Sequence, residues 1–272
     1  MSNQAGQVRD LLRKLGFLCI AGLFATAAIA GGQSGNFDIG INGKPVGTAN
    51  FDVKATPQGY DSSALVRITM QGFNYTLSKT EKLDAKNQLV HIMLSGTVNG
   101  AAVSITGRPD AANVLLNISA NGRSTTTRLD KHPAAVVLAD FDAGALETLL
   151  VMAAQHNNRD LWAIIPKGAG TMEPIKLATY SDQQGTLNGK PITVHHLVAT
   201  VGAETAGQKT DLFSGSENQL LQAELPQQGF ALVRKGFVLT PPAKPGAPPE
   251  QPAAPSGQPP APNGQPTAPN VQ

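Results

Sequence analysis

The polar residues best placed to do chemistry are two adjacent histidines, His195 and His196. They lie in a segment whose apolar residues alternate, and successive side chains of a strand point to opposite faces. One metal ion therefore cannot bind both imidazoles without a bulge. No carboxylate or further histidine stands nearby in the sequence at the spacing of a metal site. We predict no metal site, with one histidine facing the core beside a partner and the other facing water.

Two other patterns match functional motifs only in part. Gly168-Ala169-Gly170 begins like a dinucleotide fingerprint, but Glu173 replaces the third glycine and a strand-like segment follows, where phosphate binding needs a helix N-terminus. Ser34 and Ser216 have glycine neighbours, yet neither fits the G-x-S-x-G pattern of a nucleophile elbow. We predict that the protein is not an enzyme and has no catalytic residue and no cofactor. The sequence does not identify ligand-binding residues.

The first thirty residues have the composition of a secretory signal peptide. Arg9, Arg13 and Lys14 precede an apolar run over residues 15–29, and the small residues on both sides of Ile29 suit cleavage. The run is short for a membrane span, which needs about 20 residues. We predict a signal peptide over residues 1–30 and an exported protein, periplasmic or extracellular. An uncleaved signal that anchors the chain to a membrane is the alternative.

Charge and cysteine content narrow the class of protein. The net charge of +2 arises within the predicted signal, which leaves the rest of the chain neutral. Neutrality argues against nucleic acid as a partner and against a polybasic membrane-surface patch. Cys19, the only cysteine, also lies in the signal, so the exported chain would have no disulfide and no thiolate ligand. Its stability would depend on a hydrophobic core, for which roughly 210 residues suffice.

Residues 240–272 differ in composition from the rest of the chain. More than half of the 20 prolines fall here, among Ala, Gly and Gln, and Val271 is the only large aliphatic residue. Such a segment buries too little apolar area to offset the entropy of ordering it, which predicts a disordered Pro-rich C-terminal tail. The tail would act as a spacer. Alternatively, it would bind an envelope protein through sequences such as Pro259-Pro260-Ala261-Pro262.

Between these ends, apolar residues recur at every second position, which is the pattern of half-buried antiparallel strands. The predicted strands cover residues 37–41, 49–53, 66–70, 73–77, 90–94, 103–105, 114–118, 161–165, 175–180, 192–199, 220–225 and 230–233. An all-β domain of this length is common, so we predict one domain over residues 31–239.

Asn-Gly pairs mark the turns between these strands. They begin at Asn42, Asn99, Asn121 and Asn188, and both residues adopt the positive φ of a type I′ hairpin turn at low cost. The repeated sequence NGKP, at residues 42–45 and 188–191, is therefore interpreted as the same chain reversal made twice. An internal duplication of a hairpin unit is the alternative.

One segment, residues 142–155, has apolar residues at helical spacing, among them Leu146, Leu149 and Leu150. Asp140 or Asp142 can cap its start. A helix this apolar needs cover on most of its circumference. We predict a mainly β (α+β) fold: a curved antiparallel sheet or half-open barrel of hairpins with one central apolar helix.

The order of a "NGKPVGTANFDV" hairpin, an "ALETLLVMAAQ" helix, a second hairpin "LNGKPITVHHLVA" and a closing "NQLLQAELPQQGFALVR" resembles a group of uncharacterised exported or periplasmic proteins with a domain of unknown function. In shape these are similar to the half-barrel outer-membrane lipoprotein carriers. The resemblance covers about residues 37–234. It implies a half-barrel fold and leaves the activity open.

The predicted apolar faces exceed what one short helix can cover, so a half-barrel would leave a trough of the kind that ligands occupy. We expect a non-enzymatic exported envelope protein that binds an apolar small molecule, a lipid or an acyl chain. The alternative is a structural or protein-interaction module that acts through its sheet surface and its tail. A void lined by Met70, Met93 and Met152 would favour the first hypothesis, and normal packing around them the second.

Overall fold

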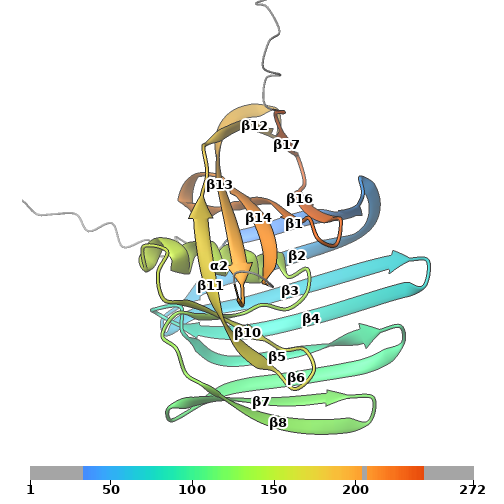
Figure 1. Ribbon diagram of the computed structural model, residues 1–272, viewed down its shortest axis with the longest axis vertical. Helices are drawn as coiled ribbons and strands as arrows, with labels where there is room; N and C mark the ends of the chain where they lie inside the picture. The colour runs from blue at the N-terminus through green and yellow to red at the C-terminus, as the bar shows by residue number, and fades with distance from the viewer. Residues whose placement is uncertain (1–32, 204–206, 242–272) are drawn as a thin grey trace, which may run out of the picture. The chain divides into compact units, whose positions relative to one another are not determined.

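The computed structural model describes residues 33–203 and 207–241. The predicted signal peptide and most of the predicted tail lie outside the described residues. Figure 1 shows the chain. Its elements are β1 (Gln33–Ile41), β2 (Lys44–Thr56), β3 (Gly59–Met70), β4 (Phe73–Asp84), β5 (Leu89–Val98), β6 (Ala101–Asp110), β7 (Asn113–Ala120), β8 (Arg123–Asp130), β9 (Ala135–Val137), α2 (Ala143–Gln155), β10 (Leu161–Ile165), β11 (Thr171–Thr179), β12 (Gln183–Leu187), β13 (Lys190–Val201), β14 (Gln208–Ser214), the 3-10 turn η1 (Ser216–Asn218), β15 (Leu220–Leu225), β16 (Phe230–Arg234) and β17 (Phe237–Leu239).

The strands form an open, curved sheet, and the described part of the chain contains one α-helix, which confirms the predicted fold class. Strands β1 to β8 are an antiparallel meander in which each strand pairs with the next. On its other side β1 pairs with β16, and the sheet continues through β15, β14, β13, β11 and β10. The short strand β9 adds to β10 in parallel.

The four Asn-Gly pairs form the predicted chain reversals. Asn42, Asn99, Asn121 and Asn188 have φ values of 48°, 50°, 53° and 52°, and each following glycine also has a positive φ. Each pair joins two consecutive strands that hydrogen-bond to one another. The repeated NGKP is thus the same turn at β1–β2 and at β12–β13.

A small second layer covers the outer face of one end of the sheet. Strands β12 and β17 pair with one another, and β12 also pairs with the first half of β13. Beneath them lies a separate cluster of Val194, Phe213, Leu221 and Phe237. Because their sequence neighbours, such as Leu212, belong to the main core, alternation along each strand places this cluster on the opposite face.

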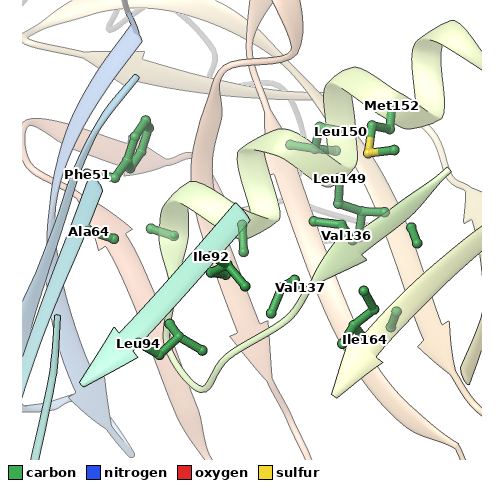
Figure 2. Packing of buried hydrophobic residues seen from close by; sticks show 14 of the residues in the cluster. Phe51, Ala64, Ile92, Leu94, Val136, Val137, Leu149, Leu150, Met152 and Ile164 are labelled. Atoms are coloured by element: carbon green, nitrogen blue, oxygen red, sulfur yellow. The ribbon is translucent and has the colours of Figure 1, made fainter. Parts of the chain in front are cut away.

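Helix α2 lies within the curve of the sheet and contacts β1, β2 and β3 on one side and β9 and β15 on the other. Its side chains from Leu149 to Ala153 are all buried. Figure 2 shows Leu149 and Met152 of the helix above Val136 of β9, with Ile92 of β5 nearby. Asp142 caps the helix, because its side chain accepts hydrogen bonds from the N–H groups of residues 144 and 145.

Two glycines test how closely the sheet is packed. A Cβ atom added at Gly96 in β5 would collide with the carbonyl oxygen of Thr76 in β4, whereas one added at Gly43, in a turn with φ 76°, would meet nothing. We expect Gly43→Ala to lower the free energy of unfolding by about 1 kcal/mol through left-handed strain. Gly96→Ala adds overpacking and should cost about 3 kcal/mol. Urea unfolding followed by circular dichroism measures both, and equal losses would contradict this packing.

Candidate functional site: an open trough beside two buried ion pairs

Helix α2 fills only part of the concave side of the sheet, and the part left open is here called the trough. One half of it, the meander groove, lies over β4 to β7 and has a volume of about 460 Å³. Its floor is apolar and comes from alternate residues of neighbouring strands, namely Leu77, Leu94, Val103, Ile105 and Ile118. These side chains face inward because strand residues alternate between the two faces.

The other half, the return groove, has a volume of about 410 Å³. Leu146 of α2 forms one wall, and Val201, Leu225 and Leu232 extend from β13, β15 and β16. Threonine and carboxylate groups also reach it, including Glu173 of β11. The return groove is therefore the more polar half of the trough.

A short segment between β9 and α2, residues 138–141, separates the two grooves and is here called the strap. Ala139 and Asp140 of the strap line both grooves, as does Lys167 from the β10–β11 loop. The Lys167 Nζ atom lies 2.8 Å from Asp140 Oδ1, and the two side chains are 60% and 35% exposed. This ion pair therefore stands where the two grooves meet.

Aromatic rings hold the strap in place. Phe141 has φ 59°, a left-handed conformation that is costly for a bulky side chain. Its ring packs edge-to-face against Tyr75 of β4 and Phe230 of β16, with centroid distances of 6.0 and 4.8 Å. The Tyr75 hydroxyl donates to the Asp140 carbonyl at 3.4 Å. Burial, together with the nearby Asp140 and Asp142 carboxylates, raises the pKa of Tyr75 above its usual value, so it remains a neutral donor.

A buried lysine fixes the start of α2. Lys79 is fully buried on the concave face of β4, and its Nζ lies 2.6 Å from Asp142 Oδ2 and 3.2 Å from Glu81 Oε2. Burial alone would lower the pKa of Lys79, but the two carboxylates outweigh it and raise that pKa, so the lysine stays charged. Burial raises the pKa of Glu81 against the attraction of Lys79. The helix cap is thus bound to the sheet by an ion pair in a dry environment.

A second buried pair fixes the middle of α2 to the opposite wall. Glu147 Oε2 accepts hydrogen bonds from the Arg234 guanidinium at 2.9 Å and from the N–H of Leu220 at 3.0 Å. Arg234 also donates to the carbonyl oxygens of Leu220 and Ser34, and its guanidinium lies over the Phe37 ring. Burial raises the pKa of Glu147 to about 7 and lowers that of Arg234, because desolvation exceeds their mutual attraction.

The two histidines face opposite sides of β13, as the alternation predicted, and the less exposed His196 has a partner; the exposed His195 also has a carboxylate partner, which was not predicted. His195 lies 2.9 Å from Asp182, and His196 lies 2.8 Å from Asp211 of β14. The His196 ring is stacked on Phe213, with a centroid distance of 4.6 Å. Within residues 33–203 and 207–241, no group of three His, Cys, Asp or Glu side chains could hold a metal ion.

The remaining motif candidates have structural places. Residues 168–170 form the turn between β10 and β11, and a strand rather than a helix follows them. Ser34 lies in β1 and Ser216 in η1. Met152 is packed in the core, and Met93 is 46% exposed on the outer face. Neither these two nor Met70 lines either groove, so the methionine criterion set out above does not favour the ligand-binding hypothesis, and the apolar walls of the trough come from branched aliphatic side chains instead.

No family model, curated protein or solved structure matches this chain. The resemblance to half-barrel lipoprotein carriers therefore stays a prediction. Among the described residues, no helix has both the length and the apolar character needed to cross a membrane. The case for a function rests on the geometry of the trough.

Removing the buried lysine tests whether it anchors the helix. Lys79→Met leaves Asp142 and Glu81 buried without a cation, and we expect the free energy of unfolding to fall by about 3–5 kcal/mol. Lys54→Met is the matched control, because Lys54 pairs with Asp52 at the surface with 75% and 44% exposure and should change stability by less than about 1 kcal/mol. Chemical denaturation measures both variants. Similar losses for the two lysines would refute the anchoring role.

The raised pKa of Glu147 predicts a pH dependence of stability. The carboxyl titrates near 4.5 in the unfolded chain and near 7 in the folded one. Between these two pH values the folded protein holds a proton on Glu147 that the unfolded chain has released. Glu147 therefore makes its full contribution to the free energy of unfolding below about pH 4.5, and this contribution is lost as the pH rises through about 7. As the pH rises from about 4.5 to about 7, we expect the free energy of unfolding of the wild type to fall by about 3 kcal/mol relative to that of Glu147→Gln. Glu217→Gln, at an exposed glutamate, is the control, and a difference for Glu147→Gln that does not change with pH would contradict the assignment.

Proposed function

We propose that the protein is a non-enzymatic exported envelope protein that binds an apolar ligand, a lipid or acyl chain, in the half-barrel trough. The observation that carries the proposal is the meander groove, a hollow of about 460 Å³ over aliphatic side chains from four adjacent strands. Export is inferred from the composition of residues 1–30.

The groove has the size and chemistry of a site for one hydrocarbon chain. Its volume of about 460 Å³ falls in the range of small-molecule sites, roughly 300–1,000 Å³. Among the described residues, Asp140 and Lys167 are the only charged ones that line it, and both stand at the strap. A chain lying on the floor would remove apolar surface from water, which is favourable by about 25 cal/mol per Å². Polar ligands would gain few hydrogen bonds there.

An interaction module is the second candidate, and one observation favours it. On the outer face of β4 to β8, five exposed serines lie in register across the strands: Ser78, Ser95, Ser104, Ser119 and Ser124. The row is uncharged and hydroxyl-rich. It would give another protein a regular hydrogen-bonding surface, with the Pro-rich tail as a second contact.

Two substitutions on strand β6 test whether the protein binds a hydrocarbon chain in the meander groove. Val103→Trp places a large ring in the meander groove, and Ala102→Trp places the same ring on the exposed outer face of β6. We expect the purified protein to bind the fluorescent fatty acid cis-parinaric acid, Val103→Trp to weaken that binding at least tenfold, and Ala102→Trp to leave it unchanged. Fluorescence titration measures this. If the wild-type protein does not bind the probe, or if both variants bind like the wild type, the chain-binding function is wrong.

A further inference from the structure

The two grooves of the trough meet at the Asp140–Lys167 ion pair, and the shape and charge of this junction indicate the kind of ligand that would fit it. We propose that the ligand is a two-chain amphiphile with a zwitterionic head group, which straddles the strap with one chain in each groove and its head at Asp140 and Lys167. This inference rests on the proposed function and specifies the chemical class of its ligand.

The number of chains follows from the division of the trough. Each groove, of about 460 and 410 Å³, lies in the lower part of the range for small-ligand sites. The strap keeps the grooves apart, because Phe141 is held between the rings of Tyr75 and Phe230. Both grooves nevertheless include Ala139, Asp140 and Lys167 in their walls. Two chains that diverge from one head group match this arrangement, and a single chain leaves one groove empty.

The chemistry of the head group follows from the charges at the junction. In the part of the chain that the structure describes, Lys167 is the only cation that lines either groove, while the carboxylates of Asp140 and Glu173 line the return groove. Asp142 also reaches that groove, but it is buried and bound to Lys79. A phosphate would pair with Lys167 and an ammonium group with Asp140 or Glu173. A purely anionic head would meet more carboxylates than cations there.

The ion pair that occupies the junction is easily exchanged. Lys167 and Asp140 are 60% and 35% exposed, and pairs of this kind contribute about 0–1 kcal/mol. A bound zwitterionic head group would replace the partially solvated Asp140–Lys167 pair with two ion pairs, one between its phosphate and Lys167 and one between its ammonium group and a carboxylate. The strap and the β10–β11 loop already hold Asp140 and Lys167 in place for this. The buried pairs at Lys79 and Arg234 remain intact, because neither Lys79 nor Arg234 lines either groove.

The test compares three soluble lipids with the exported form of the protein, by isothermal titration calorimetry below their micellar concentrations. The probes are diheptanoylphosphatidylcholine, diheptanoylphosphatidylglycerol and heptanoyl-lysophosphatidylcholine. We expect the first to bind with one molecule per protein and at least tenfold more tightly than the other two. If the single-chain lipid binds as tightly, the two-chain ligand is wrong and the proposed function stands. If diheptanoylphosphatidylglycerol binds as tightly as diheptanoylphosphatidylcholine, the zwitterionic head group is wrong. Absence of binding by all three, and by cis-parinaric acid, overturns the proposed function itself.

Two variants locate the chains and the head. Leu225→Trp fills the return groove and should lower the affinity for the two-chain choline lipid to that of the single-chain lipid, while single-chain binding in the meander groove persists. Lys167→Met should weaken the choline lipid about tenfold, and the surface control Lys54→Met should not. Near-ultraviolet circular dichroism checks that each variant is folded. Unchanged two-chain binding by folded Leu225→Trp would exclude the second chain, and unchanged binding by Lys167→Met would exclude the head-group site.

Discussion

Two buried ion pairs fix helix α2 to opposite walls of the sheet, and the positions of both grooves of the trough depend on them. Asp142 binds Lys79 of β4, and Glu147, about one and a half turns further along the helix, binds Arg234 of β16. Burying these charges costs solvation free energy that their attraction only partly returns, so the pairs contribute little to stability as compared with an apolar contact. Removing one partner, however, leaves an unpaired charge buried in the core. The pairs therefore restrict the helix to one position and one rotation.

This restriction decides where the concave side stays open. The helix contacts β1 to β3 and β15, and none of its residues lines the meander groove over β4 to β7. The strap is followed directly by Asp142, the helix cap that is bound to Lys79. One buried contact thereby places the helix cap, the strap and the Asp140–Lys167 pair in fixed relation to the trough.

Much of the fold follows from local sequence, because alternation and Asn-Gly turns are short-range signals. Even the buried charges Lys79 and Glu81 continue the every-second-residue phase of the apolar residues in β4, and that phase alone places them in the core. Strand β8 gave no such signal, since only Leu129 in it is buried. The trough could not be predicted in detail, because its walls come from distant strands and from the strap. Similarly, Asp211 becomes adjacent to His196 only when β14 pairs with β13.

The pairing of β1 with β16 has a consequence for how the protein folds. Strands β1 to β8 are joined by short turns, so the meander can form from contacts between neighbours as soon as those strands are available. Strand β1 also contacts β16, and Arg234 bonds to Ser34 across 200 residues of sequence. Closing so long a loop carries a large entropy cost and limits the rate of folding. Strand β1 therefore keeps one edge unpaired until β16 is available to pair with it. During that interval the exposed edge can pair with other chains.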